Sequence, residues 1–232
     1  MTKELLALEL AKLNLYASKV DQLEDFMHET LKANESFNLT AIKDKDAFRE
    51  LMVFDSLLPL KYVDLDSNKT VIDVGTGAGF PGLPLAICSD AKYTLLDSTN
   101  KKIGHICRVI DEFKLQNVTP ICARAEEFAL NSREAFDYAI ARAVASLNEL
   151  LELCVPLIKV GGLFIAMKGP RSDEELDDAK SAIKKLDLEV VSINEEELPI
   201  SKEKRTIIIF KKLKATNKKY PRRFSEIKAK PL

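Results

Sequence analysis

Residues 73–82 read DVGTGAGFPG and hold four of the eight glycines in this chain of 232 residues. Glycine has no Cβ, so its backbone can adopt a positive φ and can approach another backbone or a ligand closely. A chain that uses so little glycine has a local reason to gather it here. The cluster therefore predicts either a tight structural turn or a loop that holds a ligand.

The segments around this loop alternate between short β-rich runs and helical patterns. The runs are TVIDV (70–74), YTLLD (93–97), VTPICA (118–123), FDYAIA (136–141) and GGLFIAMK (161–168), and helices are expected after Pro81 and over about 100–115, 147–159 and 173–186. This alternation predicts an α/β fold with a doubly wound parallel sheet and helices on both faces. Two further strands, in LEVVSINEEEL and RTIIIFKKL, have no helix between them, so we expect an antiparallel hairpin at the C-terminal edge of the sheet.

Residues 3–60 follow a different pattern, with Leu, Val, Phe and Met three or four positions apart. That spacing is typical of amphipathic helices, and an Asn-Leu-Thr run at 38–40 interrupts it. We therefore expect three parts: an N-terminal helical segment over 1–62, a ligand-binding α/β domain over 63–214 and a basic C-terminal tail over 215–232.

The glycine spacing favours one kind of cofactor. Ligands of doubly wound sheets bind beyond the carboxyl ends of the strands, where this loop lies. The dinucleotide fingerprint is G-x-G-x-x-G, whereas this loop has Gly75, Gly77 and Gly79, with Phe80 where the third dinucleotide glycine would stand. With Asp73 two residues before the first glycine, this is the pattern of an S-adenosylmethionine loop. That cofactor carries no phosphate, and a nearby acid suits its ammonium group, directly or through water.

The ends of the next two strands add candidate contacts for an adenosine. Asp97 ends the second strand, and there a carboxylate is placed to accept both ribose hydroxyls, with Ser98 beside it. NAD enzymes use the same device, so Asp97 alone does not decide the cofactor. Ala125 and Glu126 follow the third strand, where adenine would lie. Glu126 equally fits an acid that complements the dipole at the start of a helix.

Composition disfavours several other classes of protein. The four cysteines form no C-x-x-C pair, which indicates neither a zinc site nor a redox dithiol, and we expect no metal. Only two histidines are present, which disfavours a Ser-His-Asp hydrolase. No apolar run reaches the length of a membrane span, and the charged N-terminus lacks the apolar core of a signal peptide. We therefore expect a cytoplasmic protein with no membrane contact.

Charge is distributed unevenly in the last third of the chain. Residues 171–199 carry ten acidic and four basic residues, whereas residues 200–232 carry twelve basic and two acidic ones. A basic tail on a chain of net charge -1 favours a polyanionic partner. Charge alone is equally compatible with a solvated tail that only confers solubility.

Five ordered motifs resemble the bacterial RsmG family, also called GidB: DVGTGAGFPGLPLAI, LLDSTNKK, RAEEF, FDYAIARAVASL and GGLFIAMKG. NLTAI, DSLLPL and the tail KKYPRR…KPL extend the similarity over most of the chain. The resemblance implies a Rossmann-like class I methyltransferase domain that transfers a methyl group from S-adenosylmethionine to N7 of a guanine in the decoding region of 16S rRNA. It implies 16S rRNA or the small ribosomal subunit as partner. No seam for a second chain is evident, so we expect a monomer.

Carried over residue by residue, the resemblance implies that Gly75 and Phe80 line the cofactor loop and that Ala125 and Glu126 contact the adenosine. Arg142 would lie at the reaction face. The residues expected to hold RNA are Asn38, Lys168, Tyr220, Arg222 and Arg223. The chain departs from the family pattern at 51–52, where Leu-Met replaces Arg-His, and in the tail, where FSEIKAK replaces a Gly-Thr-Pro run.

The residues also bear on which atom is methylated. ARAVAS stands where enzymes that act on exocyclic amines have an Asn/Asp-Pro-Pro-aromatic motif, and Cys154 lies inside an apparent helix, which is typical of a core residue. Guanine N7 presents an unprotonated lone pair, so no base is required and alignment can carry the reaction. Arg142 would then grip guanine O6 or a phosphate, support the amino-acid end of the cofactor, or simply cap a strand end. Asn38 and Asp55 would reach this site or act as helix N-caps.

The target guanine is expected in an accessible loop, because side chains cannot read the deep major groove of A-form RNA. Tyr220 and Phe224, among the basic residues of the tail, would stack on RNA bases. Two alternatives stay open at this point, an NAD(P)-dependent oxidoreductase and a non-catalytic RNA-binding protein. The glycine spacing disfavours the first, and the intact acids Asp73 and Asp97 disfavour the second.

Overall fold

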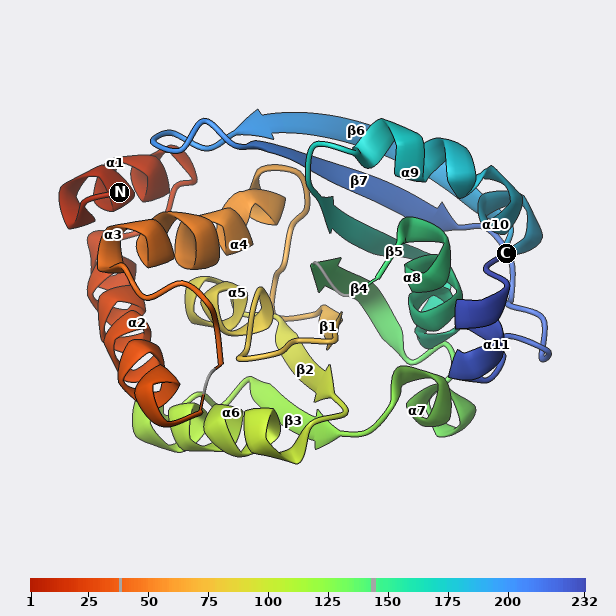
Figure 1. Cartoon of the computed structure of the whole chain (residues 1–232), viewed down its shortest axis with the longest axis horizontal. Coiled ribbons are helices and arrows are strands. Elements are labelled where there is room, and N and C mark those ends of the chain that lie inside the picture. Colours follow the sequence, from red (N-terminus) through yellow and green to blue (C-terminus); the bar gives the residue numbers. More distant parts are fainter. Residues whose placement is uncertain (38, 143–144) are drawn as a thin grey trace.

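The structure is a computed structural model that describes residues 1–37, 39–142 and 145–232. At its centre lies a seven-stranded sheet of order β3-β2-β1-β4-β5-β7-β6 (Figure 1). The strands are β1 (Thr70–Val74), β2 (Lys92–Asp97), β3 (Val118–Cys122), β4 (Phe136–Arg142), β5 (Ile158–Lys168), β6 (Leu188–Glu197) and β7 (Lys204–Lys212). The first five are parallel, and β7 pairs antiparallel with both β5 and β6. The predicted α/β fold class and its antiparallel edge hairpin are confirmed.

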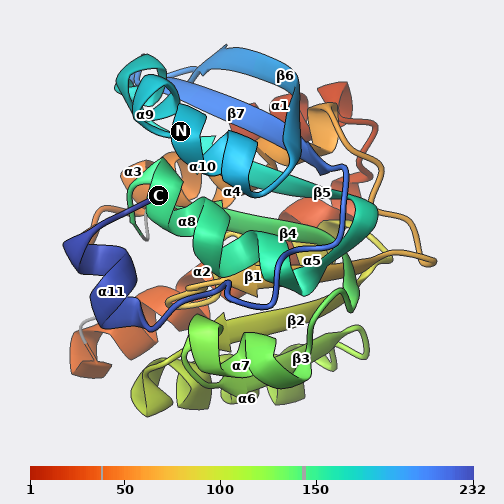
Figure 2. The same cartoon turned by 90° about the vertical axis from the view of Figure 1, so that its right-hand side faces the viewer.

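Helices cover both faces of the sheet (Figure 1). One layer consists of α1 (Lys3–Lys12), α2 (Ala17–Phe37), α3 (Lys45–Phe48), the π-helical turn η1 (Arg49–Phe54), α4 (Asp55–Leu57), the 3-10 turn η2 (Leu58–Lys61), α5 (Gly82–Cys88) and α6 (Asn100–Phe113). The other consists of α7 (Ala125–Asn131), α8 (Leu147–Cys154), the 3-10 turn η3 (Val155–Leu157), α9 (Ser172–Asp178), α10 (Lys180–Lys185) and α11 (Phe224–Ala229). Figure 2 views the molecule from this second layer, with α8 and α11 toward the viewer.

The two layers follow from the alternation of side chains along each strand. In β1, Val71 enters the core under the first layer and Ile72 the core under the second. In β7, Ile207 and Ile208 divide in the same way. Helical residues of the N-terminal segment, such as Phe26, belong to the same core as the strands. Residues 1–62 therefore share one hydrophobic core with the sheet, and the three-part division of the chain stays a prediction.

Several elements differ from the sequence-based expectation. The single helix expected over 173–186 is divided at Ala179 into α9 and α10. The helix expected over 147–159 ends at Cys154, because Pro156 lacks a backbone donor and a 3-10 turn leads directly into β5. The expected tail is folded onto α8 and contains α11, where Ile227 is 0% exposed. Cys154 is a buried core residue, as its apolar helix indicates. Within the described residues, no helix has both the length and the apolar character needed to cross a bilayer.

Candidate active site

The glycine loop connects β1 to α5 at the carboxyl edge of the sheet. Gly75, Gly77 and Gly79 have φ values of 75°, 62° and 99°, in the left-handed region that favours glycine. The loop is tied to the neighbouring strand, since the backbone N–H groups of Gly75 and Thr76 donate to the carbonyl of Leu96 at 2.8 and 3.0 Å. The position of the loop over the end of β1 is therefore fixed by β2.

The glycines serve two different purposes. A Cβ at Gly79 would clash with the side chain of Leu83, and a Cβ at Gly82 would clash with Leu95, so these two glycines allow α5 to pack closely. A Cβ at Gly77 would meet no atom within 4 Å. The stretch is thus both a tight turn and, at Gly77, a wall of an open space.

Two adjoining cavities lie at this edge of the sheet. The larger, of about 950 Å³, is bounded by the glycine loop, η1, the end of β5, α9 and the start of β7. The smaller, of about 340 Å³, lies over the ends of β2 and β3. Gly75 and Lys102 line both of them. A ligand that passes over Gly75 can therefore place one part in each cavity.

The smaller cavity brings together residues that the sequence predicts for adenosine binding. Gly75, Asp97, Ser98, Ala125 and Glu126 all line it. They come from the ends of three neighbouring parallel strands, which explains why residues so far apart in the chain meet here. Their geometry fits the expected role, and the binding itself stays a prediction.

The carboxylate of Asp97 is held in a fixed orientation. It is 7% exposed, and its Oδ2 accepts from the N–H of Gly77 at 3.0 Å. Its Oδ1 accepts from the N–H of Thr99 at 2.9 Å, and Lys102 Nζ lies 3.5 Å from Oδ2. Each carboxylate oxygen has a second lone pair, so both can still accept a hydroxyl proton. Asp97 therefore couples the glycine loop to the smaller cavity.

Asp73 is buried in the protein, which bears on its expected contact with the ammonium group; a contact through water stays a prediction. It is 0% exposed, and its Oδ2 accepts from the N–H of Gly82 at 2.9 Å, which anchors the start of α5. Burial of the carboxylate raises its pKa to about 6. A direct contact with the ammonium group of a cofactor does not fit this position, because the side chain is directed into the protein, on the face of β1 that α5 covers. Gly79 likewise supports packing rather than the cavity wall.

Phe80 links the loop to the N-terminal helices. Its ring is 5% exposed and lies 5.3 Å from Phe26 and 5.6 Å from Phe48, between ring centroids. It also lines the larger cavity, and the Arg142 guanidinium lies 5.7 Å from its centroid. The loop thus rests on an aromatic cluster supplied by residues far earlier in the chain.

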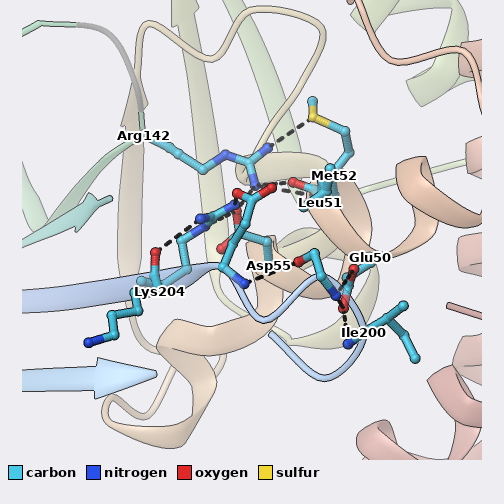
Figure 3. Close-up of polar contacts among 10 residues, drawn as sticks. Glu50, Leu51, Met52, Asp55, Arg142, Ile200 and Lys204 are labelled. Atoms are coloured by element: carbon cyan, nitrogen blue, oxygen red, sulfur yellow. Dashed lines mark hydrogen bonds and ion pairs between the residues drawn. The ribbon is translucent and has the colours of Figure 1, made fainter. Parts of the chain in front are cut away.

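Arg142 stands at the end of β4, where alternation places it on the same face as Ile140 and the N-terminal helices. Figure 3 shows its guanidinium directed toward η1, where Nη1 lies 3.4 Å from the carbonyl of Leu51 and 3.5 Å from that of Met52. Met52 Sδ is 3.9 Å from Nη2. All three residues line the larger cavity.

Asp55 joins two arginines, Arg142 from β4 and Arg205 from β7. Its Oδ2 accepts from Arg142 Nη1 at 3.2 Å and from Arg205 Nε at 3.1 Å. Asp55 is the first residue of α4 and follows η1 directly, so it is not an N-cap. Its side chain is 3% exposed and lines the larger cavity. Burial lowers the pKa of Arg142, and the nearby Asp55 carboxylate opposes that shift. The result is an arginine pair held by one buried carboxylate.

The residues predicted to hold RNA are placed very differently from one another. Lys168 is 6% exposed, and its Nζ is 2.9 Å from the carbonyl of Ala145 and 2.7 Å from Glu175. Lys168 lines the larger cavity, but its ammonium group already has these two partners within the protein. Arg223 is exposed, so its RNA contact stays a prediction. Asn38 lies outside the described residues.

Tyr220 and Arg222 do not fit the predicted RNA contacts. Tyr220 is 5% exposed in the core under the second layer, so its ring has no free face for a base. Arg222 donates from Nε and Nη2 to Glu152, at 2.8 and 2.6 Å, and Glu152 is 0% exposed. Both residues hold the C-terminal segment against α8.

Sequence reasoning missed Lys102, Arg205 and Arg171 as lining residues of the larger cavity. Lys102 had a signal, since it stands in the first turn of the helix that follows Asp97. Arg205 stands two positions before Ile207 in RTIIIF, so the two side chains share one face of the strand. The sequence does not say which element packs against that face.

Comparisons with known proteins agree with this architecture. The sequence model of GidB, described as rRNA small subunit methyltransferase G, matches residues 19–207. The Ribosomal RNA small subunit methyltransferase G of Lactobacillus delbrueckii subsp. bulgaricus is 42% identical over 240 residues, which cover 100% of both chains. The protein of the same name from Clostridium perfringens is 44% identical over 202 residues, covering 86% of this chain and 84% of that one.

Solved structures show the same fold in more distant proteins. TYW2 from M. jannaschii, solved in complex with AdoMet, has a TM-score of 0.56 and 17% identity, covering 75% of this chain and 80% of that one. A SAM dependent methyltransferase from Aquifex aeolicus has a TM-score of 0.54 and 18% identity, covering 71% and 92%. At this identity they show a common fold only. The extent of the sequence matches goes further: the chain belongs to the GidB family, the rRNA small subunit methyltransferase G family.

Proposed function

We propose that this protein transfers a methyl group from S-adenosylmethionine to N7 of one guanine in the decoding region of small-subunit rRNA. The observation that carries the proposal is the pair of adjoining cavities that share Gly75 and Lys102. One cavity has the groups that a nucleoside needs, and the other has a pair of fixed arginines beside open space. As an enzyme that acts on rRNA of the small ribosomal subunit, it would work in the bacterial cytoplasm, as a monomer.

The lining residues fit the cofactor. The buried carboxylate of Asp97 would accept the ribose hydroxyls, and Glu126 with the backbone of Ala125 would contact the adenine edge. The space beside Gly77 is open, since even an added Cβ would meet no atom within 4 Å there. When bound, S-adenosylmethionine supplies a methyl group on a positively charged sulfur. The amino-acid end would extend past Gly75 toward the larger cavity.

The larger cavity would hold the target base. Guanine N7 carries a free lone pair and releases no proton, so the residues here have to align the base rather than deprotonate it. Proximity and orientation can supply roughly 7–11 kcal/mol of a barrier. Arg142 is suited to that task because Asp55 and two backbone carbonyls fix its guanidinium. It would contact guanine O6 or a phosphate and leave N7 free for the transfer.

Contacts with the RNA backbone would come from exposed basic residues around the cavities. Arg171 is exposed and lines the larger cavity, and Arg223 is exposed next to a residue that lines the smaller one. Leu51 and Met52, which replace the Arg-His pair of the family, would present an apolar surface to the base beside Arg142. These substitutions change the wall of the cavity but leave the arginine pair in place.

A methyl-transfer assay tests the proposal. Purified protein and S-adenosylmethionine with a radioactive methyl group would be combined with small ribosomal subunits that lack this methyl mark, with their stripped rRNA and with an unrelated RNA. Labelled RNA would then be cleaved at N7-methylguanine by mild reduction and aniline. We expect label on one small-subunit guanine and its loss in Arg142→Ala. Label spread over the unrelated RNA, or a variant as fast as the wild type, would contradict the proposal.

A further inference from the structure

The C-terminal segment, residues 215–232, is locked onto the second helical layer by polar contacts. Glu152 in α8 is 0% exposed and accepts from the backbone N–H of Arg222 at 2.9 Å as well as from its guanidinium. Arg133 donates to the carbonyls of Tyr220 and Thr216, at 2.6 and 2.7 Å. Three backbone groups of the segment are thus bound to side chains of the folded body, whereas in a solvated tail they would be bound to water.

This anchoring brings Phe224 to the smaller cavity. Phe224 begins α11, is partly buried against the second core and lines the cavity that also contains Asp97 and Glu126. Ile227, one turn later, is 0% exposed and packs into the core under the second layer, which holds the helix in place. Among the described lining residues of the smaller cavity, Phe224 is the only aromatic one. The guanidinium of Arg124 lies 5.9 Å from the centre of its ring.

We infer that Phe224 stacks on the adenine of bound S-adenosylmethionine, so that the C-terminal segment forms part of the cofactor pocket. This inference rests on the proposed function and assigns a positioning role to a residue whose sequence context predicts an RNA contact. The chemistry of the cavity supports it: Leu96, Ala123 and Leu153 provide an apolar lining suited to a purine, and Asp97 provides acceptors for the ribose. A flat aromatic ring is the remaining group that a purine face needs.

The same anchoring explains why the ring would serve the cofactor rather than RNA. A ring that stacks on single-stranded RNA usually projects from an exposed surface along a basic groove. Phe224 instead is partly buried, and it shares its cavity with the two carboxylates of Asp97 and Glu126. Asp97 and Glu126 can accept hydrogen bonds from hydroxyl and amine groups, such as those of a ribose and an adenine, while Lys102 and Arg124 line the same cavity and balance their charge. The partial burial of the ring and these acceptors together favour a nucleoside.

Calorimetric titration of the full chain with S-adenosylmethionine tests the inference. Loss of one aromatic–base stack in Phe224→Ala is expected to raise Kd about tenfold. Ser225→Ala, at the exposed next position, is the matched control and should bind as the wild type does. If the wild type binds and Phe224→Ala binds equally well, the inference is overturned and the proposed function stands. If the wild type itself binds no S-adenosylmethionine, the proposed function fails and the inference fails with it.

A second variant keeps the test independent of stability. The chain contains no tryptophan, so Phe224→Trp introduces a single indole reporter. Stacking on adenine should quench its fluorescence when adenosine or S-adenosylmethionine is added, whereas methionine alone should have no effect. Unchanged fluorescence at saturating cofactor would overturn the inference. Weaker binding of cofactor-free Phe224→Ala to its rRNA, with normal cofactor affinity, would assign the ring to an RNA base instead.

Discussion

Removing the guanidinium of Arg222 should destabilise the whole protein, although its position in a basic tail indicates a solvent-exposed role. Its partner Glu152 is 0% exposed and accepts two hydrogen bonds from the Arg222 side chain, at 2.8 and 2.6 Å. Arg222→Ala leaves that buried carboxylate without the opposite charge that pairs with it. Breaking a buried pair in this way costs about 3–5 kcal/mol, and the lower end applies because the Arg222 side chain is 24% exposed.

Thermal and urea unfolding measure this cost. For a chain of this size, about 3 kcal/mol corresponds to a fall in Tm of about 6–12 °C. The double variant Arg222→Ala/Glu152→Gln should recover part of the loss, since a neutral amide needs no opposite charge. Arg223→Ala removes the same charge from the exposed neighbouring position and should change stability by no more than about 0.5 kcal/mol.

The opposite result would be equally informative. An Arg222→Ala protein that unfolds at the wild-type temperature but binds rRNA more weakly would refute the reasoning from burial. Arg222 would then act through RNA, as the basic tail predicts. A loss of stability shared by Arg223→Ala would also count against it, because the effect would come from net charge and not from Glu152.

Three further predictions concern the glycine loop and its acids. Gly82→Ala should cost about 1–3 kcal/mol in urea unfolding, because the new Cβ would clash with Leu95 and lie 2.8 Å from Asp73 Oδ2; Gly77→Ala, whose Cβ meets no neighbour, should cost only about 1 kcal/mol from its positive φ. Asp97→Ala should weaken S-adenosylmethionine binding about 10- to 100-fold by calorimetry, and equal affinity would exclude the ribose contact. The pKa of Asp73 is raised from 3.8 to about 6, so this acid stabilises the fold below pH 4 and that contribution is lost as pH rises through 6. Relative to the wild type, the free energy of unfolding of Asp73→Asn should therefore rise by about 2 kcal/mol between pH 4 and 7, and a constant difference would show that burial does not shift this pKa.

The sequence allows the strands around the cofactor loop, and the edge of the sheet at which the ligand lies, to be predicted. Periodicity identifies β1, β2 and β3, and parallel strands bring their carboxyl ends to one edge. Gly75 follows β1, Asp97 is the last residue of β2 and Glu126 lies at the start of the helix after β3, so all three positions follow from that rule. Asp73 stands at the same edge but inside the strand, and only the packing of α5 shows that its face is covered. A motif position alone does not separate the two cases.

The C-terminal segment was the least predictable part, because its interpretation depends on a partner distant in sequence. The twelve basic residues in 200–232 look the same in the sequence whether their side chains are solvated or paired with acids of the folded protein. Glu152, an acid inside the apolar run LLELC, was a signal that a buried positive charge would be needed. The sequence could not show that Arg222 supplies it, since 70 residues separate them. Without that pairing, Phe224 has no reason to be placed at the cofactor cavity.

The arginine pair shows why the N-terminal segment belongs to the site as well as to the core. Asp55 comes from that segment, Arg142 from β4 and Arg205 from β7, so the cluster exists only when all three pack together. Glu50 strengthens the same junction by accepting from the backbone N–H groups of Ile200 and Ser201 in the connection between β6 and β7 (Figure 3). A transfer to N7 has no proton transfer to assist it, so its rate depends on how well the base is held. An arginine whose rotamer is already fixed loses less conformational entropy when it grips a base. The helical segment would thus contribute to catalysis by immobilising Arg142, without a residue of its own at the reacting atoms.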